Sequence, residues 1–259
     1  MEQYIIPNLS KACRLLCFLS EHPEGVSMVE IEKELPLPKT TAFRILKTFC
    51  ASEMACKEKS LYFPGTALFR IGLQSLHGTK LREKGIPILR MLTDSARQTS
   101  HIAIPSGSYS LILEVCDSPN PVRVASRPGS LVDLHCSSTG KIFLAFLFMD
   151  RLDEIFKRNS LHRRTPHTIT DKRRMRAHLE TISREGYAVD DEEYHTGVRC
   201  IASPVRDMQS HVVAAIGITG PSIEITSDRI PDLANRVMQA ADQLSRSLGY
   251  SKKEARSIP

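Results

Sequence analysis

The chain contains 259 residues, enough for about two domains of ordinary size, each with its own core. Hydrophobic residues make up 41% of it and charged residues 25%, and no stretch of about 18 apolar residues predicts a membrane span. The N-terminal residues lack the pattern of an export signal, so we expect a cytoplasmic protein without a membrane partner. The formal net charge of +6 is compatible with a polyanionic partner but does not by itself indicate one.

Seven cysteines are scattered along the chain without a Cys-x-x-Cys pair. An odd number of widely spaced cysteines in a chain of this length predicts reduced, buried thiols rather than a disulfide framework. Cys13 and Cys17 lie four residues apart with no histidine or third cysteine near them, so we expect both in a core. Glycine motifs for phosphate or dinucleotide binding are absent from the sequence. We therefore predict no metal and no cofactor.

Three helices are predicted within the first 50 residues. Apolar residues recur at intervals of three and four in residues 9–21, and a break at 22–25 ends that helix. Ser27 and Glu30 have the spacing of a capping box at the start of a second helix. We expect that helix to place three apolar residues in the core, namely Val29, Ile31 and Leu35. A third helix follows the prolines at 36 and 38 and carries on one face Ala42, Phe43, Leu46 and Phe49.

Charge is polarised within this N-terminal part. Residues 21–34 carry five glutamates and one lysine, whereas residues 38–59 carry five basic residues and two glutamates. Residues 54–57 and 60–63 predict two short strands around a charged turn, which is the wing of a winged helix-turn-helix. In such a domain the third helix enters the DNA major groove and the wing meets phosphate. The predicted DNA-binding residues are Ser27, Lys39, Thr40, Thr41, Arg44, Lys47, Lys57 and Lys59.

The remaining residues predict an α+β domain. A connecting helix is expected at 66–78 and another at 80–98, in which Pro87 predicts a break or a helix start. Strands are expected at 99–104, 109–116, 122–126, 188–189, 198–205 and 212–219. Helices are expected at 138–149, 150–160, 171–185 and 227–248. Hairpins mixed with helices indicate a largely antiparallel sheet.

Two stretches of this second part have the chemistry of a binding site. Residues 134–141 place small hydroxyl side chains and Gly140 at a helix start, where free backbone amides favour a carboxylate. An ordinary capped helix explains the same residues. Residues 190–193 are four consecutive acids beside strands. We expect them to order their loop by accepting backbone hydrogen bonds, or to meet a ligand hydroxyl.

An enzyme or a metal sensor is the alternative. Cys200 with His135 or His195 and Asp190 has the residue types of a nucleophile, a base and an orienting acid. The same side chains are possible metal ligands. Their spacing matches no catalytic or metal-binding signature, so we predict no catalysis.

Several motifs in order resemble the IclR family of bacterial transcriptional regulators across essentially the whole chain. They are residues 39–46, 134–141, 186–193, 197–202 and 216–221. The resemblance implies a winged helix-turn-helix (1–65), a linker helix (66–80), a GAF-like effector-binding domain (81–250) and a C-terminal tail (251–259). It implies a repressor that binds a palindromic operator as a homodimer or homotetramer and responds to a small organic or sugar acid.

Carried over from the family, the effector site comprises Val124, Val132, Ser138, Thr139, Gly140, Asp190, Val198, Cys200, Gly217 and Thr219. This chain departs from the family at Gly217 and Thr219, where serine is frequent. The missing hydroxyl at Gly217 removes one hydrogen-bond donor and predicts room for a ligand larger than the smallest keto acids.

Overall fold

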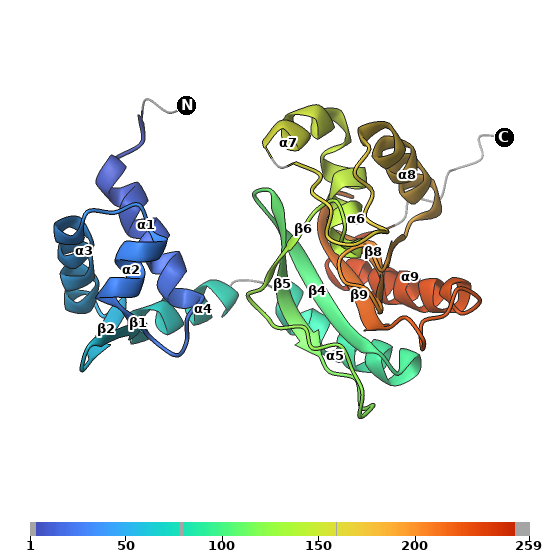
Figure 1. The fold of residues 1–259 in the computed structure, drawn as a ribbon. Coiled ribbons are helices and arrows are strands. Elements are labelled where there is room, and N and C mark those ends of the chain that lie inside the picture. Colours follow the sequence, from blue (N-terminus) through green and yellow to red (C-terminus); the bar gives the residue numbers. More distant parts are fainter. Residues whose placement is uncertain (1–3, 78–79, 159, 252–259) are drawn as a thin grey trace. The chain divides into compact units, whose positions relative to one another are not determined.

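The computed structural model describes residues 4–77, 80–158 and 160–251 and divides the chain into two compact units, residues 1–79 and 80–259 (Figure 1). Residues 252–259, most of the predicted tail, lie outside the described residues. Within the described parts, no helix is long and apolar enough to cross a membrane.

The first unit is a winged helix-turn-helix. Its helices are α1 (Pro7–Ser20), α2 (Met28–Glu34), α3 (Lys39–Ala51) and α4 (Thr66–His77). Its three-stranded sheet has the order β1-β3-β2, with β1 (Val26–Ser27), β2 (Ala55–Glu58) and β3 (Leu61–Pro64). The strands β2 and β3 form the predicted hairpin, and Lys59 turns it with a positive φ of 54°. The predicted fold class is confirmed for this unit.

The core of the first unit selects one face of each helix. Leu15 and Leu19 from α1 meet Ile31, Leu46 and Tyr62 in a single buried cluster. Ile31 is the only buried residue of α2, a helix of seven residues. Side chains two residues apart in a helix point in directions that differ by about 200°. A residue two positions from a buried one therefore points away from the core.

That geometry corrects three predictions. Val29 is 73% exposed because it lies two residues from Ile31, and Phe43 is 45% exposed because it is turned away from the buried Ala42. Cys13 and Cys17 are exposed because each precedes a buried leucine by two residues. Every cysteine in the described residues is free, but only Cys136 is classed as fully buried, so the prediction of buried thiols is wrong.

The second unit is built on a six-stranded antiparallel sheet with the order β6-β5-β4-β9-β8-β7. Its strands are β4 (Thr99–Ser106), β5 (Tyr109–Cys116), β6 (Leu131–Asp133), β7 (Ala188–Asp191), β8 (Val198–Arg206) and β9 (Val212–Pro221). Its helical segments are α5 (Lys80–Ala96), α6 (Ser138–Leu147), η2 (Met149–Arg151), α7 (Leu152–Arg158), α8 (Lys172–Glu185) and α9 (Ile230–Ser247). This is the predicted α+β arrangement.

Alternating side chains give the two faces of this sheet different cores. Large side chains on one face, including Ile102, Ile201 and Ile216, pack against α5 and α9. Alanines on the other face, including Ala202 and Ala215, pack against α6 and α8. Small side chains let the apolar residues of α6 approach the strands closely, and the candidate binding cavity lies on this face.

Two segments differ from the sequence-based expectation. Helix α5 continues through Pro87, because Pro87 and Glu83 are both exposed and the unpaired carbonyl of the helix is on the solvent side. Residues 122–126 are irregular, and the additional strand is instead β6. Prolines at positions 121 and 128 bound the irregular segment and lack the N–H groups that a sheet ladder needs.

Candidate DNA-binding surface and effector cavity

The predicted DNA-binding residues lie on α3 and the wing. Lys39, Thr40, Arg44 and Lys47 are exposed along α3, and Lys57 and Lys59 are exposed on the hairpin. Thr41 is half-buried. Lys39 is paired with Glu32 of α2 at 3.4 Å, and the Lys57 ammonium lies 5.4 Å from the centroid of the Tyr62 ring. The surface therefore presents cations from two separate elements.

The side chain of Ser27 caps the N-terminus of α2. Its hydroxyl accepts a hydrogen bond from the backbone N–H of Glu30, and the Glu30 carboxylate accepts one from the backbone N–H of Ser27. Ser27 also pairs with Leu61 of the wing. This capping box attaches the start of α2 to the hairpin, so Ser27 fixes the wing beside the helices.

A cavity of about 390 Å³ lies on the α6 face of the second unit. It brings together all of the predicted effector residues except Gly140 and Gly217. The predicted residues that line it are Val124, Val132, Ser138, Thr139, Asp190, Val198, Cys200 and Thr219. They come from the irregular segment after β5, from β6, from the N-terminus of α6 and from β7, β8 and β9.

The two glycines have packing roles instead. A Cβ atom on Gly140 would lie 2.4 Å from the Leu134 Cα atom, so glycine lets residues 134–137 fold back onto the start of α6. A Cβ atom on Gly217 would lie 2.4 Å from the Ile201 carbonyl oxygen. The space beside Gly217 is occupied by β8, and the prediction that Gly217 enlarges the cavity is wrong.

The N-terminus of α6 forms one wall of the cavity. Ser137 caps this helix and accepts a hydrogen bond from the backbone N–H of Gly140 at 3.1 Å. The Thr139 hydroxyl is 2.8 Å from the Ser110 hydroxyl of β5. The backbone N–H groups of Ser138 and Thr139 have no partner within the helix, and the helix dipole adds partial positive charge. This wall suits a carboxylate.

The four consecutive acids lie at the end of β7 and the start of the loop after it, and of these Asp190 lines the cavity. Each of the four has a different partner. Asp190 accepts hydrogen bonds from the backbone N–H groups of Glu193 and Tyr194 at 2.8 and 3.2 Å. Asp191 pairs with Arg199, and Glu192 accepts a hydrogen bond from the Gly197 N–H at 2.6 Å. Asp190 and Glu192 thus order the loop by accepting hydrogen bonds from backbone amides, which is one of the two roles predicted for the acids.

Glu193 connects this loop to α6. Its carboxylate is ion-paired with Lys141, a residue with no solvent exposure, and Lys141 also donates to the Val189 carbonyl. Both Thr165 and Thr168 donate to the Glu193 carbonyl. The second carboxylate oxygen of Glu193 is buried without a partner among the described residues. Lys141 thereby holds α6 and the loop together.

Burial also changes the acidity of Asp190. Removal from water raises the pKa of this carboxyl to about 7, against the opposing attraction of Lys141 and the two loop amides. A carboxyl group with this pKa is partly protonated at neutral pH. In its protonated form the carboxyl group donates a hydrogen bond to an anion, and in its ionised form it only accepts hydrogen bonds.

His101 is a cavity residue that was not predicted from the sequence. This residue of β4 is 5% exposed, lines the cavity and has a buried Nδ1 atom without a hydrogen-bond partner in the described residues. Burial lowers the pKa of His101 to about 4, so the imidazole is neutral at pH 7. His101 lies within a predicted strand, and the sequence of that strand does not indicate which face of the sheet lines a cavity.

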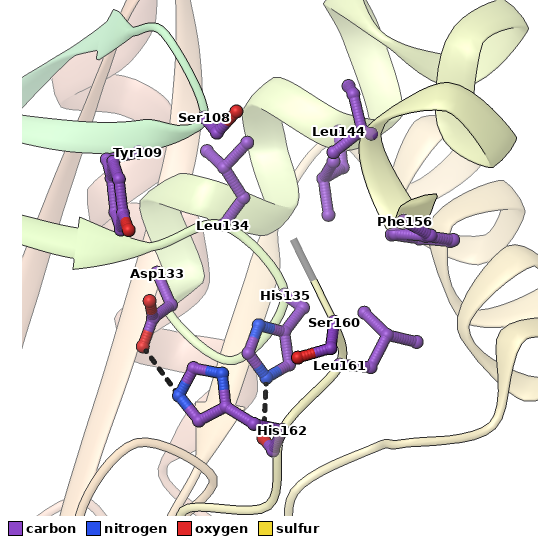
Figure 2. A pocket seen from close by; sticks show the side chains of 11 residues that line it. Ser108, Tyr109, Asp133, Leu134, His135, Leu144, Phe156, Ser160, Leu161 and His162 are labelled. Carbon is purple, nitrogen blue, oxygen red and sulfur yellow. Dashed lines mark hydrogen bonds and ion pairs between the residues drawn. The ribbon is translucent and has the colours of Figure 1, made fainter. Parts of the chain in front are cut away.

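Of the two histidines in the enzymatic alternative, His195 lines the same cavity as Cys200 and Asp190 but is exposed. His135 lines a separate cavity of about 230 Å³ beside α7, whereas Cys200 and Asp190 line the cavity described above. Figure 2 shows His135 in that second cavity, with its Nε2 atom 2.9 Å from the His162 carbonyl oxygen. Burial and the nearby Asp190 raise the pKa of Cys200 well above its ordinary value, which opposes thiolate formation.

Metal ligation also lacks a suitable cluster. Among the residues that the structure describes, no group of three or more histidine, cysteine, aspartate or glutamate side chains is placed to hold a metal ion. Cys200 instead lies with its sulfur 3.1 Å from the Thr219 hydroxyl.

We expect Lys141→Met to lower the free energy of unfolding by about 3–5 kcal/mol, because it leaves Glu193 charged and buried without its partner. The matched double variant Lys141→Met, Glu193→Leu removes both charges and should recover most of that loss. Urea unfolding measures both. Equal stability of the single and double variants would show that the ion pair does not hold α6 and the loop together.

Removal of the unpartnered histidine nitrogen should stabilise the empty protein. We expect His101→Leu to raise the free energy of unfolding by about 1 kcal/mol, because a buried polar group without a partner costs about 1–3 kcal/mol. His101→Gln, which stays polar, serves as the control. A decrease for His101→Leu in urea unfolding would mean that the ring has a stabilising partner.

Comparison with known proteins agrees with this arrangement. The family model described as "Bacterial transcriptional regulator IclR C-terminal" matches residues 73–246, and the "IclR helix-turn-helix domain" matches residues 8–54. The repressor AllR of Klebsiella pneumoniae is 31% identical over 243 residues, which cover 93% of this chain and 89% of that protein. AllR of Escherichia coli K12 is also 31% identical over 243 residues, covering 93% of this chain and 90% of its own.

Solved structures share the fold. The IclR structure of Thermotoga maritima is 29% identical, with a TM-score of 0.72 over 93% of this chain and 98% of that chain. An IclR homologue of Microbacterium hydrocarbonoxydans, solved with 4-hydroxybenzoate, is 21% identical, with a TM-score of 0.81 over 93% of this chain and 98% of its own. The resemblance found in the sequence is confirmed: the chain belongs to the IclR family of bacterial transcriptional regulators and carries the family's helix-turn-helix domain.

Proposed function

We propose that this regulator is a cytoplasmic repressor that binds a palindromic operator and releases it when a small organic or sugar acid enters the α6 cavity. The main support is the cavity, which is lined by Ser138 and Thr139 at the N-terminus of α6 and by the polar side chains of Asp190 and Thr219. The AllR relatives are named as repressors, which supports repression rather than activation.

The cavity lining favours an acid that carries further polar groups. The amides of α6 suit its carboxylate, while Asp190, Thr219 and His101 offer hydrogen bonds at other points of the wall. Val124, Val132 and Val198 suit its carbon atoms. A volume of about 390 Å³ holds more than a two-carbon acid, so a hydroxylated or sugar acid suits the site.

Binding without catalysis is part of the proposal. Hydrolysis through Cys200 needs a thiolate beside a base, whereas this thiol is kept protonated by burial and His135 lies in another cavity. His195 lines the rim of the effector cavity but is exposed.

The proposed operator binding requires at least two identical subunits. Residues 1–64 carry equal numbers of basic and acidic residues, so affinity has to come from the placement of charge rather than from net charge. A homodimer or homotetramer places two α3 helices one DNA turn apart on a palindrome. We assign residues 66–80 to the link between the DNA-binding domain and the effector domain.

Arg44 and Lys57 should affect DNA binding differently. We expect Arg44→Ala to cost about 1–3 kcal/mol on the operator and to relax base preference, because arginine is the side chain that pairs with guanine edges. Lys57→Ala should weaken binding to every sequence and lower the salt dependence, as a phosphate contact does. Gel shifts on operator and scrambled DNA at two salt concentrations distinguish the two. A uniform loss for Arg44→Ala would remove its assignment to base readout.

The effector is identified by thermal shift against a panel of keto, hydroxy and sugar acids. An acid present at 100 times its Kd should stabilise the protein by about 2.7 kcal/mol and release the operator in a gel shift. Thr139→Phe should keep operator binding and lose the response, because the bulky ring enters the cavity beside Ser110. If no acid both stabilises the protein and releases DNA, the proposed effector class is wrong.

The response should depend on pH through Asp190. The pKa of about 7 means that this carboxyl is protonated below neutral pH and then no longer repels an acid effector. We expect effector affinity to rise as pH falls from 8 to 6, and Asp190→Asn to abolish that dependence. Isothermal titration at pH 6, 7 and 8 measures it. A pH dependence that is unchanged in Asp190→Asn would assign the titration to another group.

A further inference from the structure

Phe43 is an aromatic side chain exposed on a face that otherwise carries cations. It lies on α3 one residue after the buried Ala42, and 45% of its surface is exposed. An exposed phenyl ring is unfavourable in water, since burying a large apolar side chain is worth about 1.5–3 kcal/mol. The exposed part of the ring therefore does not contribute to the core of the domain.

The surroundings of Phe43 point to its partner. A groove of about 360 Å³ between α3 and the wing is lined by Met28, Lys39, Thr40, Phe43, Lys57 and Tyr62. Lys39 and Lys47 lie one helical turn on either side of the ring, and the Lys47 ammonium is 5.8 Å from the ring centroid. An apolar surface bounded by lysines complements a polyanion that also exposes apolar groups.

DNA has this combination of properties in its major groove. Phosphates line its edges, and the C5 methyl group of thymine is the apolar group on its floor. Phenylalanine has neither a donor nor an acceptor, so it cannot read the hydrogen-bonding edges of the bases. A protein partner would instead have to cover Lys39, Lys47 and Lys57 together with the ring, at the cost of removing their charges from water.

We propose that Phe43 contacts thymine methyl groups in the major groove and that it sets a preference for T·A base pairs within the operator. The inference rests on the proposed operator binding and adds an apolar contact to the cationic residues already assigned. In this arrangement Lys39 and Lys47 bind the phosphates on either side of the base that the ring contacts.

The test uses the full-length protein and an operator selected from random DNA. Each thymine of that operator is replaced in turn by deoxyuridine, which lacks only the C5 methyl group. At one or two positions we expect the replacement to weaken wild-type binding about fourfold, the value of one buried methyl group. Phe43→Ala should bind the two DNAs equally at those positions, whereas Phe43→Leu should retain part of the discrimination.

Controls separate this contact from other effects. Lys47→Ala should weaken binding to thymine and uracil DNA alike, and thermal unfolding checks that each variant is folded. If Phe43→Ala keeps the wild-type ratio of thymine to uracil affinity at every position, the proposal is wrong. The same conclusion follows if Phe43→Ala changes the oligomeric state in sedimentation without changing that ratio, because the ring then meets a second copy of the chain. Failure of the wild-type protein to select any sequence would instead overturn the proposed operator binding.

Discussion

Lys141 and Glu193 form an ion pair in the interior of the second unit, and it joins two elements that line the effector cavity. Lys141 belongs to α6, whose N-terminal amides face the cavity, and Glu193 belongs to the loop that carries Asp190. A buried lysine is costly unless it is paired, so the pair holds these elements at a fixed separation. The start of α6 and the shape of the loop are therefore linked through one contact.

Two further polar groups of the cavity, His101 and Asp190, are buried at a cost to stability. His101 is buried with an unpartnered nitrogen, and Asp190 has a pKa near neutrality because it is removed from water. In a core made only for stability, both positions would be apolar. These costs are understandable in a binding site, where a ligand supplies the missing partners and gains affinity from groups that the fold has already oriented.

The DNA-binding unit uses charge in a different way. Its lysines and arginine are exposed on α3 and the wing, where water and salt screen their charges. Phe43 adds an apolar surface between them. The candidate DNA-binding side chains of the first unit are thus exposed to solvent, whereas the polar groups His101 and Asp190 of the cavity in the second unit are buried.

The sequence by itself determined the winged helix-turn-helix, the α+β second part with most of its helices and strands, and eight of the residues that line the cavity. Helical periodicity, the Ser27 cap and the hydroxyl-rich start of α6 are local properties that neighbouring residues specify. Only the tertiary structure decided which cavity His135 faces, that His101 lines the effector cavity, and that Gly217 packs against β8. Phe43 and Cys13 were misassigned for a related reason, since a helix with apolar residues on several sides has more than one possible buried face. Contacts with other elements select that face, and the sequence of one helix does not contain them.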